Sequence, residues 1–165
     1  MAEVIRIPNR HCATRTAAVD LLVLHAMGEW VISRRGLYHH CTDYLQSSGL
    51  SVHAFCLPDG RIIESVDPAL KAFHAGQAND RSIGMELVIA GGHDLTSLRQ
   101  RMNDVDAPPF TAAQYEAAGW WFRQQADEHG LDQSSIRTHA ELDPARKEDP
   151  GRAFDMARFL QVFDR

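Results

Sequence analysis

Four polar residues have the types and positions that a hydrolytic metal centre needs. His25 ends an apolar run, Glu86 lies inside a second apolar run, and His139 and Asp149 stand at the two ends of a proline-containing segment. Two imidazoles and one carboxylate that leave a fourth position open are the ligand pattern of a catalytic zinc rather than a structural one. A histidine at a strand end is also common as an ordinary hydrogen-bonded residue, so only the combination favours a zinc site.

Glu86 is the most informative of the four because apolar residues surround it. Met85 precedes it and Leu87 follows it. Burying an unpaired carboxylate at such a position would cost on the order of several kcal/mol, so something must compensate for its charge. One hypothesis is a general base whose pKa is raised towards neutrality by burial. The alternatives are an edge strand on which Glu86 faces solvent, and a salt bridge to an arginine.

The segment from His139 to Asp149 belongs to a stretch that contains Pro144, Pro150 and Gly151. Proline interrupts helices, so this stretch is predicted to be a shaped loop rather than a helix. Loops carried by a rigid sheet are where ligand-binding residues converge. The alternative for this segment alone is a solvated loop of mixed charge.

Strands must position His25 and Glu86. Val19–His25 and Ser82–Ala90 are predicted to be strands covered on both faces, because their apolar residues are nearly continuous. The sequence Pro58-Asp59-Gly60 predicts a turn between two further strands at 51–57 and 61–66. This pair is expected to form a hairpin. His25 is expected at the carboxyl end of its strand.

Helices are expected to flank these strands. Apolar residues recur at helical spacing over about 34–48, and Thr111 with Gln114 forms a capping box that opens a helix reaching about His129. A short helix is expected at 154–163. Strands interleaved with helices indicate an α/β fold with a central mixed sheet flanked by helices, because a hairpin is embedded in it. Without repeats or linkers, all 165 residues are expected to form one domain.

Composition excludes several classes of partner. The net charge is -5 and no block of lysine or arginine is present, so nucleic acid is not expected as a partner. The three cysteines lack CxxC spacing and are expected to be reduced. No run approaches the length of a membrane span, and the first residues lack a basic segment followed by a long apolar stretch, so no secretory leader is expected. We expect a monomer that stays in the cytoplasm as synthesised and reaches a cell wall only through lysis or delivery.

Five stretches of the sequence resemble, in order, the motifs of one enzyme family. They are LLVLHAM, SVHAFCLPDGRIIESV, AFHAGQAND, RSIGMELV and THAELDPARKEDPGRAFDMARF. On these motifs the chain is identified as a member of the N-acetylmuramoyl-L-alanine amidase type 2 family. That family includes zinc amidases of the phage T7 lysozyme type, cytosolic muropeptide-recycling amidases and peptidoglycan recognition proteins. The resemblance covers about residues 21–159 and implies the α/β fold of the family.

The resemblance implies a role for each matched residue of the centre. His25, His139 and Asp149 would hold one Zn²⁺ per chain. Glu86 would be the catalytic residue that accepts and returns a proton. Lys147 matches the family lysine that faces the reacting carbonyl group, and it would stabilise the negative charge that develops there.

Substrate-binding residues are implied less directly. His74 and Asn79 match the family's substrate-facing loop, in which Phe73 stands where tryptophan is usual. His53 lies in the predicted hairpin, where it would either face the cleft and contact substrate or simply pack against its neighbours.

The family hydrolyses the amide bond between N-acetylmuramic acid and L-alanine, so peptidoglycan or a muropeptide is the implied substrate. Position 149 is an aspartate, which resembles the ligand found at this position in the recycling branch. The region 27–50, however, is shorter than the insertion that this branch carries there. The shorter region favours an endolysin that degrades cell walls. The alternatives are a cytosolic recycling amidase for anhydro-muropeptides, a non-catalytic peptidoglycan-binding module, and a zinc hydrolase for another amide.

Overall fold

Two long parallel strands form the centre of the computed structural model, which describes residues 2–165. β3 (Leu21–Ile32) and β8 (Ser82–His93) pair from Leu21 beside Ser82 onwards, with an irregularity after Gly28. Both strands were predicted, but both are longer than their apolar runs. His25 therefore lies inside β3 rather than at its carboxyl end. The apolar pattern ends where the strands leave the covered part of the sheet, whereas their backbone pairing continues.

The remaining strands complete a mixed sheet around this pair. The order is β1-β6-β5-β8-β3-β4, and β9 also pairs with β3. β5 and β6 form the predicted antiparallel hairpin, and β5 runs parallel to β8. β2 and β7 make a separate two-stranded sheet. The bounds of these strands are β1 Val4–Arg6, β2 Cys12–Thr14, β4 Tyr38–His40, β5 Ala54–Cys56, β6 Ile62–Glu64, β7 Leu70–Ala72 and β9 Ile136–Thr138.

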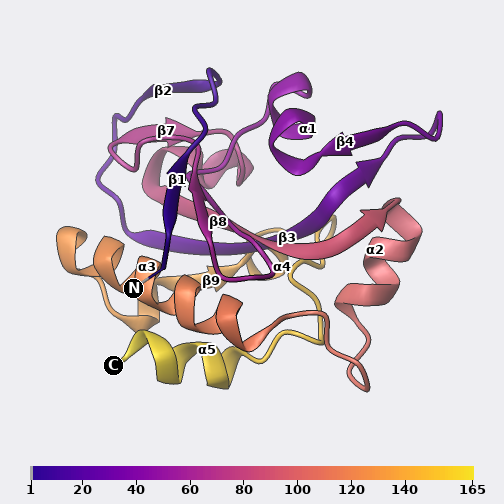
Figure 1. Cartoon of the computed structure of the whole chain (residues 1–165). Coiled ribbons are helices and arrows are strands. Elements are labelled where there is room, and N and C mark those ends of the chain that lie inside the picture. Colours follow the sequence, from indigo (N-terminus) through magenta and orange to yellow (C-terminus); the bar gives the residue numbers. More distant parts are fainter. Residues whose placement is uncertain (1) are drawn as a thin grey trace.

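Helices α3 (Ala112–His129) and α5 (Met156–Phe163) lie together on one side of the sheet, orange and yellow in Figure 1. The predicted capping box of α3 is present, and Gly130 ends the helix in the left-handed conformation. The two helices approach closely because Gly119 has no side chain, and a Cβ there would lie 2.6 Å from a Val162 methyl group. The main core fills this layer. It includes Leu22, Leu24, Met85, Leu87, Trp121, Phe122 and Phe159.

Helix α1 (Cys41–Ser47) covers the opposite face of the sheet over a second, smaller core (Figure 1). The predicted helix at 34–48 is therefore correct only in its second half. Gly36 has a left-handed backbone (φ 74°) in a turn after β3, and the next residues pair with β3 as strand β4. Backbone pairing with the sheet overrides the helical spacing of the apolar residues in this stretch.

Two further helices each follow a strand of the sheet, one after β8 and one after β9. α2 (Leu95–Met102) occupies a stretch in which no helix was predicted, and Asp94 caps it by accepting a hydrogen bond from the Ser97 amide. α4 (His139–Leu142) opens the segment predicted to be entirely loop. Short 3-10 helices η1 (Gly76–Arg81) and η2 (Gln133–Ser135) precede β8 and β9. Among the described residues, no helix combines the length and the apolar character needed to cross a membrane.

Candidate active site

His25 and Glu86 are neighbours across the two central strands. They are register partners in the parallel pairing of β3 with β8. Adjacent residues of a strand point to opposite faces, so these two side chains point away from the face that Leu24 and Met85 cover with the α3 layer. The sheet thus places an imidazole and a carboxylate side by side on the face that also carries α1.

His139 and Asp149 reach the same place from the segment after β9. His139 is the first residue of α4, whose capping box consists of Thr138 and Glu141. The backbone oxygen of Asp149 accepts a hydrogen bond of 3.1 Å from the Ala140 amide, which closes the segment back onto α4. The predicted pair is therefore brought together by one short helix and one backbone hydrogen bond.

Three side-chain atoms converge in a triangle. His25 Nδ1 lies 2.9 Å from His139 Nδ1 and 3.3 Å from Asp149 Oδ2, and His139 Nδ1 lies 3.1 Å from the same oxygen. These atoms form a group that can hold a metal ion. Zinc–ligand distances of about 2.0–2.1 Å place tetrahedral ligand atoms roughly 3.3–3.4 Å apart. The donor atoms and their spacing therefore fit zinc with modest expansion of the triangle.

The charge states of the triangle also suit a metal. Burial lowers the pKa of His25, and this effect outweighs the hydrogen bond and charge of Asp149. Burial acts to raise the pKa of Asp149, but its hydrogen bonds with His139 and His25 outweigh burial and hold that pKa well below its usual range. At neutral pH His25 is thus a neutral imidazole and Asp149 is an anion, which are the forms that bind a metal ion.

One carboxylate oxygen of Glu86 is enclosed and has no hydrogen-bond partner among the described residues. This atom, Oε2, is buried, although the residue as a whole is partly exposed. Burial raises the pKa of Glu86 well above its ordinary value, the charge of Asp149 raises it further, and Lys147 opposes the shift. Neither structural alternative holds, because β8 lies between β5 and β3 rather than at an edge, and no arginine pairs with Glu86 among the described residues. The general-base hypothesis remains.

A cleft of about 490 Å³ opens over these residues. Lys147 lies exposed at its rim, two residues before Asp149. The walls come from α1, α2, the loop around His74 and the segment after α4. Besides the residues already named, they include Met27, Tyr44, Leu45, Leu50, Ser51, Phe73, Leu95, Leu98, Arg99, Met102 and Arg146.

The three residues expected to bind substrate have different surroundings. His74 lines the cleft, but its Nδ1 is 2.8 Å from Nε2 of His25. Asn79 also lines the cleft, and its Oδ1 accepts hydrogen bonds from the amides of His74 and Ala75. His53 is fully buried, and its Nδ1 accepts a hydrogen bond from the Gly84 amide. Of the two alternatives for His53, the structure therefore supports packing inside the fold and not a position that faces the cleft.

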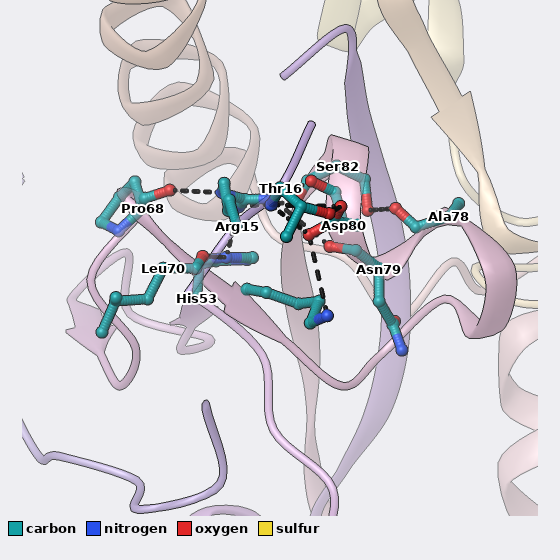
Figure 2. Close-up of polar contacts among 10 residues, drawn as sticks. Arg15, Thr16, His53, Pro68, Leu70, Ala78, Asn79, Asp80 and Ser82 are labelled. Carbon is teal, nitrogen blue, oxygen red and sulfur yellow. Dashed lines mark hydrogen bonds and ion pairs between the residues drawn. The ribbon is translucent and has the colours of Figure 1, made fainter. Parts of the chain in front are cut away.

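Arg15 is a residue near this site that sequence reasoning missed. Figure 2 shows its guanidinium among backbone carbonyl groups, including that of Asn79, and beside His53. A single arginine in a polar N-terminal stretch carries no sequence signal, because its partners lie 38 to 67 residues further along the chain.

Known proteins resemble this chain along most of its length. The family profile described as N-acetylmuramoyl-L-alanine amidase matches residues 15–152. The 1,6-anhydro-N-acetylmuramyl-L-alanine amidase AmpD of Escherichia coli (strain K12) is 29% identical over 180 residues, covering 93% of this chain and 88% of that protein. AmpD of Enterobacter cloacae is 27% identical over 176 residues, which cover 92% of this chain and 84% of that protein.

Solved structures agree with the fold. A crystal structure of a selenomethionine derivative of AmpD superimposes with a TM-score of 0.73 at 26% identity, covering 98% of this chain and 95% of that one. The N-acetylmuramoyl-L-alanine amidase LysC from Clostridium intestinale has a TM-score of 0.67, covers 99% of both chains and is 14% identical. At that identity the second likeness concerns the fold alone.

Proposed function

Because the chain belongs to the N-acetylmuramoyl-L-alanine amidase family, we propose that it hydrolyses the amide bond between N-acetylmuramic acid and the L-alanine of a stem peptide, with one zinc ion as cofactor. One observation carries the proposal. The donor atoms of His25, His139 and Asp149 converge within 3.3 Å of one another at the floor of a cleft. An enclosed carboxylate, Glu86, stands in register with His25.

Glu86 moves the proton in the proposed reaction. Zinc, when bound by the triangle, supplies Lewis acidity that lowers the pKa of a water molecule and polarises the scissile carbonyl group. Glu86 accepts a proton from the attacking water and delivers it to the alanine nitrogen as the C–N bond breaks. Its raised pKa supports this role, because the carboxyl group must hold the proton between the two steps.

Lys147 stabilises the charge that develops on the carbonyl oxygen. Its side chain is exposed at the cleft rim, and its backbone is held by the hydrogen bond from the Lys147 amide to the Asp143 carbonyl. A donor that acts on an oxyanion of this kind contributes about 3–4 kcal/mol to the barrier when it is deleted.

We further propose soluble anhydro-muropeptides as the first substrate to test. The curated relatives at 27–29% identity are named as 1,6-anhydro-N-acetylmuramyl-L-alanine amidases, and each alignment covers most of both chains. Degradation of intact walls is the second candidate. The short region between β3 and the hairpin favours it, since a shorter insertion leaves more of the cleft open to a polymer. Endolysins of the same fold support only the architecture.

The test compares products on both substrates. Purified chain is incubated with anhydro-muropeptides and, separately, with intact sacculi, and new L-alanine amino termini are counted. We expect new amino termini without new reducing sugar ends, faster on the soluble substrate. Glu86→Gln should release almost none, whereas Glu128→Gln, on the exposed side of α3, should match the wild type. Binding of either substrate without any new amino termini would instead identify a recognition module.

A further inference from the structure

His25 makes a second contact on the side away from the triangle. Its Nε2 lies 2.8 Å from Nδ1 of His74, and the two rings meet edge to face with centroids 5.0 Å apart. The other nitrogen of His74, Nε2, lies 3.2 Å from the hydroxyl oxygen of Ser82. That hydroxyl lies 2.7 Å from the backbone oxygen of Ala78. Three links thus join the candidate metal ligand to one carbonyl group.

The direction of each hydrogen bond in this chain of contacts is fixed by its last member. A carbonyl oxygen can only accept, so the Ser82 hydroxyl donates its one proton to Ala78. The Ser82 oxygen is then free to accept from His74, which places the proton of His74 on Nε2. Nδ1 of His74 is left bare and accepts the proton on His25 Nε2. His25 Nδ1, which faces the triangle, therefore carries no proton.

We propose that His74 is a positioning residue that selects the Nε2-protonated tautomer of His25 and fixes its ring, and that Ser82 and Arg15 hold His74 for this purpose. The proposal rests on the zinc site of the proposed function. It reassigns His74, which was expected to contact substrate. Residues that accept the second N–H of a metal-binding histidine orient the ligand and raise its basicity.

Gly84 makes the position of His74 possible. A Cβ atom built on Gly84 would lie 2.4 Å from Nδ1 and 2.5 Å from Cε1 of His74. Any larger residue at 84 would push the imidazole away from His25. The same strand residue donates its amide to Nδ1 of His53, so backbone and side chains are interlocked here.

Arg15 holds the segment that carries His74. Its guanidinium donates to the backbone oxygens of Pro68 (3.1 Å), Asp80 (3.0 Å) and Ser82 (2.8 Å), so one side chain ties both ends of this segment together (Figure 2). The Nη2 atom also lies 2.9 Å from Nε2 of His53. A lysine could not reproduce this arrangement, because an ammonium group lacks the planar fork of donors.

Thr16 anchors the same segment from the other side of Arg15. Its amide donates to the Asp80 carboxylate at 2.9 Å, and its hydroxyl donates to the second oxygen at 2.5 Å. Lys71 lies 3.7 Å from this carboxylate. The backbone around Ser82, which must present its hydroxyl to His74, is therefore held by the side chains of Arg15 and Thr16, two adjacent residues that are distant from it in sequence (Figure 2).

Two measurements on the full chain test the proposal without any muropeptide. The first is zinc affinity, obtained by competition with a chromogenic chelator. We expect His74→Leu to bind zinc about 10–100-fold more weakly than the wild type. His74→Asn should stay within a few-fold, because its Oδ1 can accept from His25 at the place of Nδ1. Ser82→Ala and Arg15→Lys should show intermediate losses, and His129→Leu, at the end of α3, should show none.

The second measurement is the tautomer of His25, obtained from long-range ¹H–¹⁵N spectra of the metal-free protein, in which no zinc occupies Nδ1. We expect a proton on Nε2 and none on Nδ1 in the wild type and in His74→Asn. Far-ultraviolet circular dichroism identifies any variant that fails to fold, in which case Ser82→Ala carries the comparison. A proton on Nδ1 in the wild type would overturn the proposal.

Substrate kinetics separate the two roles of His74. Wild-type zinc affinity in His74→Leu, together with a raised KM for muropeptide, would return His74 to substrate binding and overturn the proposal. Failure of the proposed reaction would show differently, as a chain that binds zinc with the predicted order of affinities but releases no L-alanine amino termini.

Discussion

His25 and Glu86 are register partners on β3 and β8, the two long parallel strands at the centre of the sheet. A candidate metal ligand and a candidate proton acceptor are thus held in position by backbone hydrogen bonds of the sheet rather than by loops. Groups built on strands are held more precisely than groups on loops, which suits a reaction that depends on their separation. The remaining candidate ligands, His139 and Asp149, come from a segment that the fold must bring to the sheet.

Replacing Glu86 with glutamine tests the proton transfer. The amide keeps the size of the side chain but cannot accept a proton, so we expect kcat to fall about 10²–10⁴-fold. Burial raises the pKa of the Glu86 carboxyl group in the folded state. As the pH rises above about 4.3, the pKa of glutamate in the unfolded state, this group therefore destabilises the fold. The variant should therefore unfold in urea at neutral pH with a free energy no lower than that of the wild type. Retained kcat would remove Glu86 from the mechanism.

Replacing Lys147 tests stabilisation of the developing charge. Lys147 is exposed and pairs with no acid among the described residues, so Lys147→Met should leave the melting temperature unchanged. We expect kcat to fall about 10²–10³-fold. Steady-state kinetics on a defined muropeptide give the comparison. A change confined to KM would show that Lys147 binds the ground state instead of the transition state.

Removing the metal tests the triangle through stability. Zinc that binds only the folded chain raises its stability by about 4 kcal/mol at a concentration 1,000 times its Kd. We expect the melting temperature to fall after treatment with a chelator and to recover with zinc. In Asp149→Asn this difference should largely disappear, because the anionic ligand is lost. Asp127→Asn, on the exposed surface of α3, is the matched control and should behave as the wild type. Zinc-independent melting of the wild type would contradict the site.

The buried His53 predicts a pH dependence of stability in the metal-free protein. Burial lowers its pKa to about 3, and the charge of Arg15 adds to this effect, whereas the unfolded value is about 6.5. As the pH falls, the His53 imidazole therefore binds a proton in the unfolded state before it does so in the folded state. The contribution of His53 is fully present above about pH 6.5 and is lost as the pH falls towards 3, by about 1.4 kcal/mol per pH unit.

Urea unfolding between pH 7 and pH 4 checks this slope. His53→Asn should be less stable at pH 7, because its ring contacts are lost, but its free energy of unfolding should fall less steeply with pH. His129→Asn should keep the wild-type slope. If the free energy of unfolding changed equally with pH in the wild type and in His53→Asn, His53 would not titrate as its burial requires.

Local sequence signals predicted the elements that form the core of the site. The apolar runs around His25 and Glu86 indicated both central strands, and Thr111 with Gln114 located the start of α3, because each signal depends on residues close together in sequence. The helix at 34–48 was half wrong, since pairing of β4 with β3 is not encoded in local spacing. The start of α4 was missed although Thr138 and Glu141 form a recognisable capping box.

The surroundings of the site lay beyond sequence reasoning for a different reason. The contacts among Arg15, His53 and His74 join segments that are distant in sequence. The residues next to each of them in sequence do not predict these contacts. The choice between the two positions of His53 stayed open for the same reason. Side chains alternate between the two faces of a hairpin, so the sequence places His53 on one face. Only the packed structure shows that this face is covered.

A zinc titration of amide cleavage tests the central claim most directly. Metal-free chain is titrated with zinc, and release of L-alanine amino termini from a defined anhydro-muropeptide is measured at each step. We expect no cleavage without zinc. In the wild type, the rate of cleavage should rise with added zinc and saturate at one zinc per chain. In His139→Ala, this rise should be abolished. Cleavage that proceeds at the same rate in metal-free protein, or that survives in His139→Ala, would contradict the claim.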